Sequence, residues 1–280
     1  MRDTILALGC SFTDPNFKAG NVPADFPNHL KGGWKVWPEI FRDRLSERDG
    51  VEYKVMNIGK SGSGMDWHAN AFFQHWTDYK KDIKAVLWGG SSWYRFYHMT
   101  TKERFAATDL SDPKFYNSPE EAINERTDRM KKCGMYEYTK SVAFSLSTHE
   151  ARKEIAKKYM SMIVGIKDLC ESNGVDFMLY QLLEPMTAPS FNHIGASKDS
   201  INRAVQLNLF KSVSNAWEQL CNSKHIIGWN RSDFVESWAT RYKNRPYLIE
   251  DNVDFPNNDS HPNEAGQVHI AEIFWNNYTS

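Results

Sequence analysis

Two kinds of hydrophobic pattern follow one another along the chain. Short runs rich in apolar residues, typical of buried strands, occur at residues 4–8, 53–58, 83–88, 175–179 and 225–227. Apolar residues recur at helical spacing in residues 37–45, 65–79, 150–170, 201–221 and 268–275. Strands that alternate with helices are typical of a parallel sheet covered on both faces. The pattern therefore predicts an α/β protein: a three-layer α/β/α sandwich around a central parallel sheet of about five strands.

Two stretches interrupt this alternation. Residues 14–36 are rich in Gly, Pro and Asn, which predicts a long loop after the first strand. Residues 95–148 carry many charges together with Pro113 and Pro119, and we expect no strand within them. Long excursions from compact domains are usually functional or disordered. We therefore expect a single domain over residues 1–280, with residues 95–148 forming either a lid over a site or a solvated surface insertion.

Composition and charge narrow the classes of function. The formal net charge is −1, which offers no electrostatic attraction to nucleic acid, and no apolar stretch is long enough to span a bilayer. Residues 1–3 run directly into the first strand, so we expect no signal peptide and a cytoplasmic location. The four cysteines are scattered, which predicts reduced thiols and no metal site. Aromatic residues reach 14%, with ten Trp, and we expect them mainly in the core, although some could line a groove for a sugar.

The first candidate for chemistry is Ser11, in residues 9–13 (Gly-Cys-Ser-Phe-Thr), directly after the first strand. Parallel α/β sheets place their sites beyond the carboxyl ends of the strands. A Ser hydroxyl becomes an effective nucleophile when a base and an orienting acid support it. His261 precedes the last predicted helix, and Asp259 stands two residues before it. The alternatives are a Ser that only turns the chain and an Asp that caps a helix.

Two glycine-rich segments follow the second and third strands. Residues 57–64 (Asn-Ile-Gly-Lys-Ser-Gly-Ser-Gly) expose backbone N–H groups that can hold a developing oxyanion. This segment is not a phosphate-binding loop, because the earlier Gly of that motif would fall at Lys54. Residues 89–91 (Gly-Gly-Ser) end the third strand and offer the Ser91 hydroxyl as a donor, unless they form a routine turn.

In this order, the four segments resemble the SGNH (GDSL-type) hydrolases, over residues 9–266. The resemblance implies a flavodoxin-like fold in which Ser11 is the nucleophile and His261 is the base. It also implies an oxyanion hole formed by the backbone N–H groups of Ser11 and Gly62 with a third donor. No metal or organic cofactor is implied.

Two positions depart from the family pattern. Ser91 stands where the family has Asn, and a hydroxyl donor has a shorter reach than an amide. The acid usually lies three residues before the His, where this chain has Asn258. We favour Asp259 as the acid, with Asp254 in reserve.

The sequence therefore predicts a serine esterase or acyl hydrolase that uses a Ser-His-Asp triad and an acyl-enzyme. The expected partner is a small-molecule or carbohydrate ester, such as an acetyl or short acyl group on a sugar. Trp93 and Arg95 follow Ser91 closely and are candidate substrate contacts, although Arg95 could equally pair with an internal carboxylate. The alternatives are an acyltransferase on the same fold and a non-catalytic binding or structural module. The oligomeric state is left open.

Overall fold

The computed structural model describes residues 2–16, 34–93, 95–97, 104–106, 128, 130–132, 134, 136–138, 149–183, 185, 214–229, 237–241 and 261–280. The main sheet consists of β1 (Thr4–Leu8), β2 (Lys54–Asn57), β3 (Ile83–Gly90), β6 (Asp176–Gln181) and β7 (Ile226–Ile227). These five strands are all parallel and lie in the order β2-β1-β3-β6-β7. When these five strands are numbered in chain order, their order in the sheet is 2-1-3-4-5, which is the flavodoxin-like arrangement of doubly wound sheets. The predicted fold class is confirmed.

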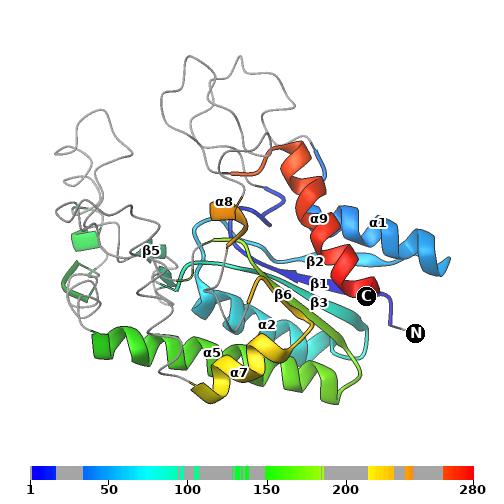
Figure 1. Cartoon of the computed structure of the whole chain (residues 1–280). Helices are drawn as coiled ribbons and strands as arrows, with labels where there is room; N and C mark the ends of the chain where they lie inside the picture. Colours follow the sequence, from blue (N-terminus) through cyan, green and yellow to red (C-terminus); the bar gives the residue numbers. More distant parts are fainter. Residues whose placement is uncertain are drawn as a thin grey trace, which may run out of the picture.

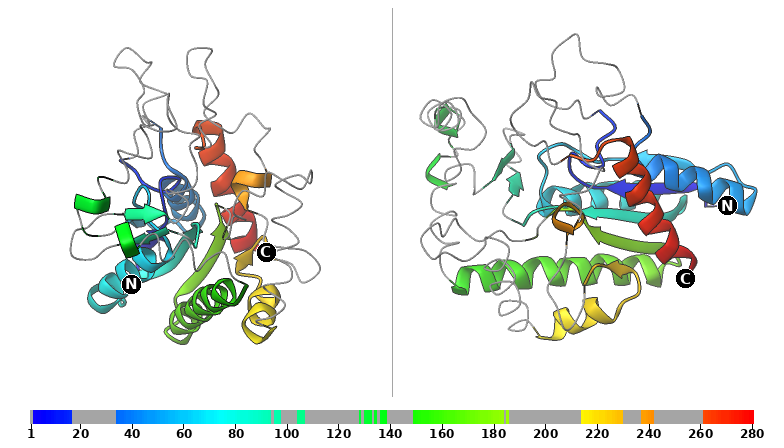
Figure 2. Two further views of the ribbon diagram at one scale, coloured as in Figure 1. Left: turned by 90° about the vertical axis from the view of Figure 1, so that its left-hand side faces the viewer. Right: turned by 45° about the horizontal axis from the view of Figure 1, so that its top comes forward.

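Helices cover both faces of the sheet, as Figure 1 shows. One layer contains α1 (Trp37–Asp49) and α9 (Glu264–Thr279), and the other contains α2 (Met65–Tyr79), α5 (His149–Ser172) and α7 (Ser214–Asn222). The two rotated views of Figure 2 keep these layers separate. The predicted helix at 65–79 has the observed bounds of α2. Residues 201–213 of another predicted helix lie outside the described residues, and the short α8 (Trp238–Arg241) was not predicted.

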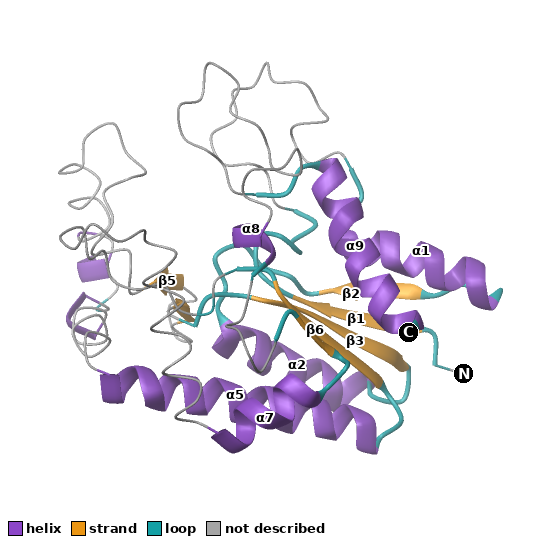
Figure 3. Cartoon of the chain, viewed as in Figure 1, coloured by secondary structure: helices purple, strands orange, loops and turns teal. Residues whose placement is uncertain are grey.

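Residues 95–148 contain two strands, so the prediction that they contain none is wrong. The antiparallel pair of β4 (Arg95–Tyr97) and β5 (Arg104–Ala106) begins shortly after β3 ends (Figure 3). Each strand has only three residues, which is too short for alternation to stand out in the sequence. Most of the other residues of 95–148 lie outside the described residues, and the choice between a lid and a solvated surface insertion stays a prediction.

The sheet is buried on both faces, which explains the continuous apolar runs of its strands. Along β1, Leu6 and Leu8 pack into a cluster with α2, α5 and α7. Ile5 faces the opposite cluster, which α1 and α9 complete. Seven of the ten Trp residues are buried, so the aromatic excess belongs mainly to the core, as expected. Among the described helices, none combines the length and apolar character that crossing a membrane would require.

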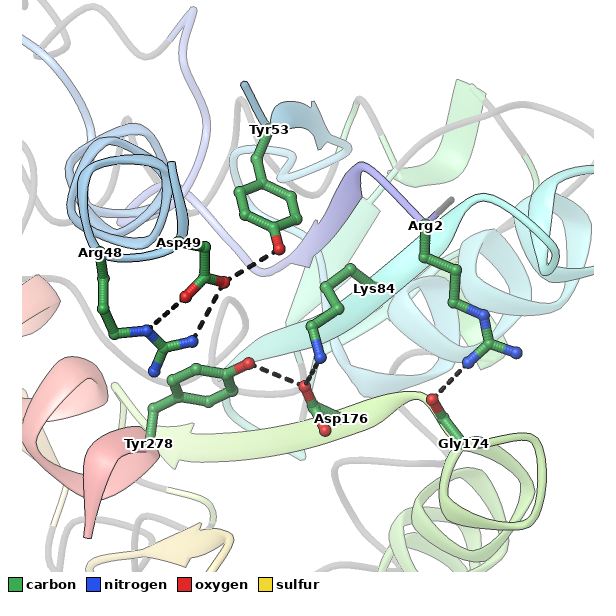
Figure 4. Close-up of polar contacts among 8 residues, drawn as sticks. All are labelled: Arg2, Arg48, Asp49, Tyr53, Lys84, Gly174, Asp176 and Tyr278. Atoms are coloured by element: carbon green, nitrogen blue, oxygen red, sulfur yellow. Dashed lines mark hydrogen bonds and ion pairs between the residues drawn. The ribbon is translucent and has the colours of Figure 1, made fainter. Parts of the chain in front are cut away.

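At the amino-terminal edge of the sheet, polar contacts fasten the last helix (Figure 4). Asp176, the first residue of β6, accepts hydrogen bonds from Lys84 Nζ and Tyr278 Oη, each at 2.8 Å. Nearby, Asp49 pairs with Arg48 at 2.6 Å and accepts the Tyr53 hydroxyl at 3.0 Å. The contact from Tyr278 ties the far end of α9 to the sheet, and thereby helps to fix the helix whose start follows His261.

Stability is expected to fall in alkali, because burial raises the pKa of Tyr278 and its hydrogen bond to Asp176 raises it further. The native phenol stays protonated while an unfolded tyrosine loses its proton near about pH 10. The contribution is therefore complete below about pH 10 and is lost as the pH rises towards the native pKa. Denaturant unfolding between neutral and alkaline pH checks this. Tyr278→Phe should flatten the alkaline decline, whereas the same change at exposed Tyr79 should not; equal declines in both variants would contradict the assignment.

Candidate active site

Ser11 and His261 meet at the carboxyl-terminal edge of the sheet. Beyond β1 the chain turns sharply, because the N–H groups of Thr13 and Asp14 both bond to the Cys10 carbonyl, at 2.9 and 3.0 Å. Ser11 lies at the start of this turn and is 7% exposed. His261 Nε2 is 2.7 Å from Ser11 Oγ, although 250 positions separate the two residues. A hydroxyl and an imidazole at this distance can exchange a proton directly.

His261 is held by the start of α9. The Asn263 side chain caps this helix by accepting a hydrogen bond from the Gly266 N–H at 2.9 Å. The imidazole lies 5.3 Å from the Phe12 ring, measured between centroids. Gln267, on the first turns of α9, donates to the Phe12 carbonyl at 3.3 Å. The helix is thereby joined to the turn that carries Ser11. Asp259 and Asp254, the two candidates for the orienting acid, lie outside the described residues.

The loop after β2 forms a tight turn around Gly62. The Ser63 N–H bonds to the Lys60 carbonyl at 3.0 Å, and Gly62 has a φ of 73° at the third position of this four-residue turn. A positive φ there favours Gly. Among the described residues, neither the Ser11 N–H nor the Gly62 N–H donates a hydrogen bond to the protein. Two backbone donors are therefore available on the two loops expected to form an oxyanion hole.

A buried carboxylate joins these two loops. Asp14 is 6% exposed, and its Oδ2 accepts hydrogen bonds from the Ser61 N–H and the Ser61 hydroxyl, both at 2.8 Å. Asn57 adds a second link by donating to the Thr13 carbonyl at 2.7 Å. Sequence reasoning had not assigned Asp14 a role. The signal was a carboxylate in the turn just after the nucleophile, where Asp commonly bonds to nearby backbone.

Behind the turn of residues 60–63, called the glycine turn below, lies His68, which sequence reasoning also missed. His68 is fully buried, and its Nδ1 lies 3.0 Å from Trp88 Nε1. An indole N–H only donates, so Nδ1 must accept, and the ring proton of the neutral imidazole is on Nε2. That proton points to the Ser63 hydroxyl at 2.9 Å, which in turn donates to the Lys60 carbonyl at 2.6 Å. This chain of bonds runs from β3 to the turn that contains Gly62.

His68 remains neutral because it is fully buried and close to a positive charge. Burial lowers its pKa to about 3, and the positive charge of Arg95 contributes to the shift. A uniformly neutral ring keeps one donor and one acceptor at all ordinary pH values, which suits it to brace a loop. The apolar positions of α2 fall at Met65, Ala69, Phe72 and Trp76. His68 belongs to the same face, and this spacing was the signal of its burial.

Ser91, the candidate third oxyanion donor, directs its hydroxyl elsewhere. It is fully buried, and its Oγ donates to the Ser63 carbonyl at 2.9 Å. A hydroxyl has a single proton, so Ser91 would have to give up this bond to act on an oxyanion. Its own carbonyl accepts a hydrogen bond from Gln181 at 2.9 Å. Ser91 thus ties the end of β3 to the glycine turn in this structure.

The two candidate substrate contacts occupy different environments. Trp93 is 2% exposed and packs in an aromatic cluster with Tyr159 and Trp229, at centroid distances of 5.6 and 6.2 Å. Contact between Trp93 and a substrate stays a prediction. Arg95 is half-buried, and its guanidinium lies 3.4 Å from the Ser91 hydroxyl. Across the described part of the chain, no group of three or more His, Cys, Asp or Glu is arranged to hold a metal ion.

Comparisons with known proteins found similarity to solved structures alone. No protein-family model matches the chain, and a search of curated proteins found no match. A catalytic mutant of Axe2, an acetylxylan esterase from Geobacillus stearothermophilus, is 13% identical, with 98% of this chain and 93% of that chain covered and a TM-score of 0.46. TesA is 14% identical, with coverage of 98% and 97% and a TM-score of 0.45. The psychrotrophic esterase EstA from a Pseudoalteromonas species is 11% identical, with coverage of 99% and 97% and a TM-score of 0.43.

Proposed function

We propose that this protein is a serine hydrolase of the SGNH type that cleaves carboxylic esters. The observation that carries the proposal is the 2.7 Å contact between Ser11 Oγ and His261 Nε2 at the carboxyl ends of the parallel strands. A serine that only turned the chain would have no need of an imidazole brought from the other end of the sequence. The two available N–H groups on the adjoining loops supply the second element that ester cleavage requires.

In the proposed reaction, His261 Nε2 takes the Ser11 proton as the hydroxyl oxygen attacks the ester carbonyl carbon. The carbonyl oxygen becomes an oxyanion, which the N–H groups of Ser11 and Gly62 stabilise. The C–O bond to the alcohol breaks, and His261 returns the proton to the leaving alcohol. Water then attacks the acyl-enzyme by the same route and releases the acid. Asp259 is our candidate for the group that orients the imidazole.

The proposal covers carboxylic esters as a class, and acetylated or short-chain acylated carbohydrates are the narrower candidates within it. The aromatic excess that suggested a sugar is now accounted for mainly by the core, where seven Trp residues are buried. A substrate screen should therefore include small aryl esters as well as acetylated sugars.

One observation favours a non-catalytic module as the second candidate. The Ser91 hydroxyl is bonded to the Ser63 carbonyl, so the oxyanion would have two backbone donors without the third. Losing one donor of this kind costs on the order of 10²–10³ in rate. This reduces the rate of a hydrolase, but the loss is small beside the overall acceleration that enzymes achieve.

Labelling with a fluorophosphonate probe tests the proposal. An activated serine displaces fluoride from phosphorus and keeps the phosphonyl group, so intact-mass spectrometry of the folded protein should show one adduct. Peptide mapping should place it on Ser11, and the Ser11→Ala variant should remain unlabelled. Unlabelled wild-type protein would favour the non-catalytic module, and an adduct on another serine would contradict the assignment of the nucleophile.

A further inference from the structure

Arg95 lies close to the turn around Gly62: its backbone packs on Gly64, and its side chain contacts Ser91. Its carbonyl oxygen packs so closely on Gly64 that a Cβ at Gly64 would clash with it. Its guanidinium Nη1 lies 3.4 Å from the Ser91 hydroxyl, which itself bonds to the carbonyl of Ser63, the residue after Gly62. A cation is therefore held beside the loop that is proposed to bind the oxyanion.

This cation has no carboxylate partner within ion-pair distance among the residues that the structure describes. Arg44 provides the contrast, because it is also partly exposed but pairs with Glu272 at 3.3 Å. Removing a charge from water is costly unless a partner compensates for the lost hydration. A guanidinium has five N–H donors, and Arg95 uses one of them in a long bond to a hydroxyl. Within the described part of the chain, the remaining donors are available to an anion that comes from outside.

The positive charge of Arg95 acts on His68, the buried residue of α2 behind the turn around Gly62. It is the second cause, after burial, of the lowered pKa of His68. The alternative that Arg95 only packs the β4–β5 pair explains its backbone contact with Gly64, but not why a cation is placed there with no counter-charge among the described residues. A planar guanidinium matches the two oxygens of a carboxylate better than any other cationic side chain.

We propose that Arg95 binds a carboxylate carried by the ester substrate, so that the protein prefers acidic esters to neutral ones of the same shape. This inference rests on the proposed esterase function. It narrows the substrate class to esters with a negative charge close to the scissile bond, on either the acyl or the alcohol side. Because a guanidinium keeps its charge at all working pH values, the preference follows the ionisation of the substrate.

Matched ester pairs test this preference. On the alcohol side, para-carboxyphenyl acetate is compared with para-carbamoylphenyl acetate; on the acyl side, the para-nitrophenyl esters of para-carboxybenzoic and para-carbamoylbenzoic acid are compared. The rigid rings prevent the carboxylate from attacking its own ester. The wild-type protein should show a higher kcat/KM for the acidic member of at least one pair. In Arg95→Gln, the acidic-to-neutral ratio of that pair should fall by about 10- to 100-fold.

Two further variants complete the test. Arg95→Lys keeps the charge without the planar fork and should retain part of the preference, which also covers the case in which Arg95→Gln fails to fold. Arg44→Gln makes the same change at a paired arginine remote from the site, and should keep the wild-type ratio. An Arg95→Gln ratio equal to that of the wild type, or equal losses on both members of a pair, would overturn the inference and leave the esterase proposal standing. No hydrolysis of any of the four esters by the wild type, together with no fluorophosphonate adduct, would overturn both.

Discussion

Replacing His261 with Ala is expected to lower kcat for ester hydrolysis by on the order of 10⁴-fold. The imidazole is 2.7 Å from Ser11 Oγ, and a serine hydroxyl is a weak nucleophile without a base to take its proton. Fluorophosphonate labelling of Ser11 should slow in parallel, because formation of the Ser11–phosphorus bond requires the same proton transfer. Stopped-flow or spectrophotometric assays of an activated aryl ester measure the first quantity, and intact-mass time courses measure the second.

The control for this variant is His75→Ala. His75 lies on α2, and its Nδ1 contacts the Ala71 carbonyl at 2.8 Å, away from the site; its removal should leave kcat near the wild-type value. Added imidazole should restore part of the rate of His261→Ala, since the truncated side chain leaves space beside Ser11. A His261→Ala protein within about tenfold of the wild-type rate would show that the contact is structural.

The local spacing of apolar residues was sufficient to predict most strands of the main sheet and most of the helices that cover it. The residues 4–8 and 65–79 predicted as strand and helix have the observed bounds of β1 and α2. Their apolar spacing is strong because the sheet is buried on both faces and α2 packs one complete face into the core. The β4–β5 pair was missed because three-residue strands carry too little periodicity. α8 has four residues and was missed for the same reason.

In the candidate site, too, some features could be predicted from the sequence and others could not. Ser11, Gly62 and His261 were proposed from their positions at the ends of predicted elements and from the family resemblance. The bond that directs the Ser91 hydroxyl to the Ser63 carbonyl depends on how two loops approach each other, and no local pattern encodes that. The same holds for Asp14, which bonds to a loop 47 positions away. Residue types were readable from the sequence, whereas the partners of their hydrogen bonds required the fold.

His68 shows why such partners matter, and replacing it is the second change with a large expected effect. In His68→Ala, the Trp88 N–H and the Ser63 hydroxyl each lose a buried partner, and a void replaces the ring. Unpaired buried groups and a cavity together should lower the free energy of unfolding by about 2–4 kcal/mol. The turn around Gly62 should loosen as well, so kcat should fall by about tenfold while KM changes little. Chemical denaturation and steady-state kinetics on one preparation measure both.

Two isosteric variants separate the hydrogen bonds from the packing. His68→Phe fills the space without either bond, whereas His68→Gln offers an amide that can accept from Trp88 or donate to Ser63. A positioning role predicts that Gln recovers more of kcat than Phe does, even where the two are equally stable. If Phe restores kcat fully, the ring acts through packing alone.

The pH dependence of unfolding provides an independent readout of the same residue. The native pKa of His68 is about 3, whereas an unfolded histidine titrates near about 6.5. Between these values the unfolded state binds the additional proton, so the wild-type free energy of unfolding should rise with pH across this window and level off above it. Removing the titrating group in His68→Gln should reduce that slope by the contribution of one proton. An unchanged slope would mean that the imidazole takes up its proton in the native state over the same pH range as in the unfolded state, which is incompatible with a ring whose Nδ1 accepts the Trp88 N–H.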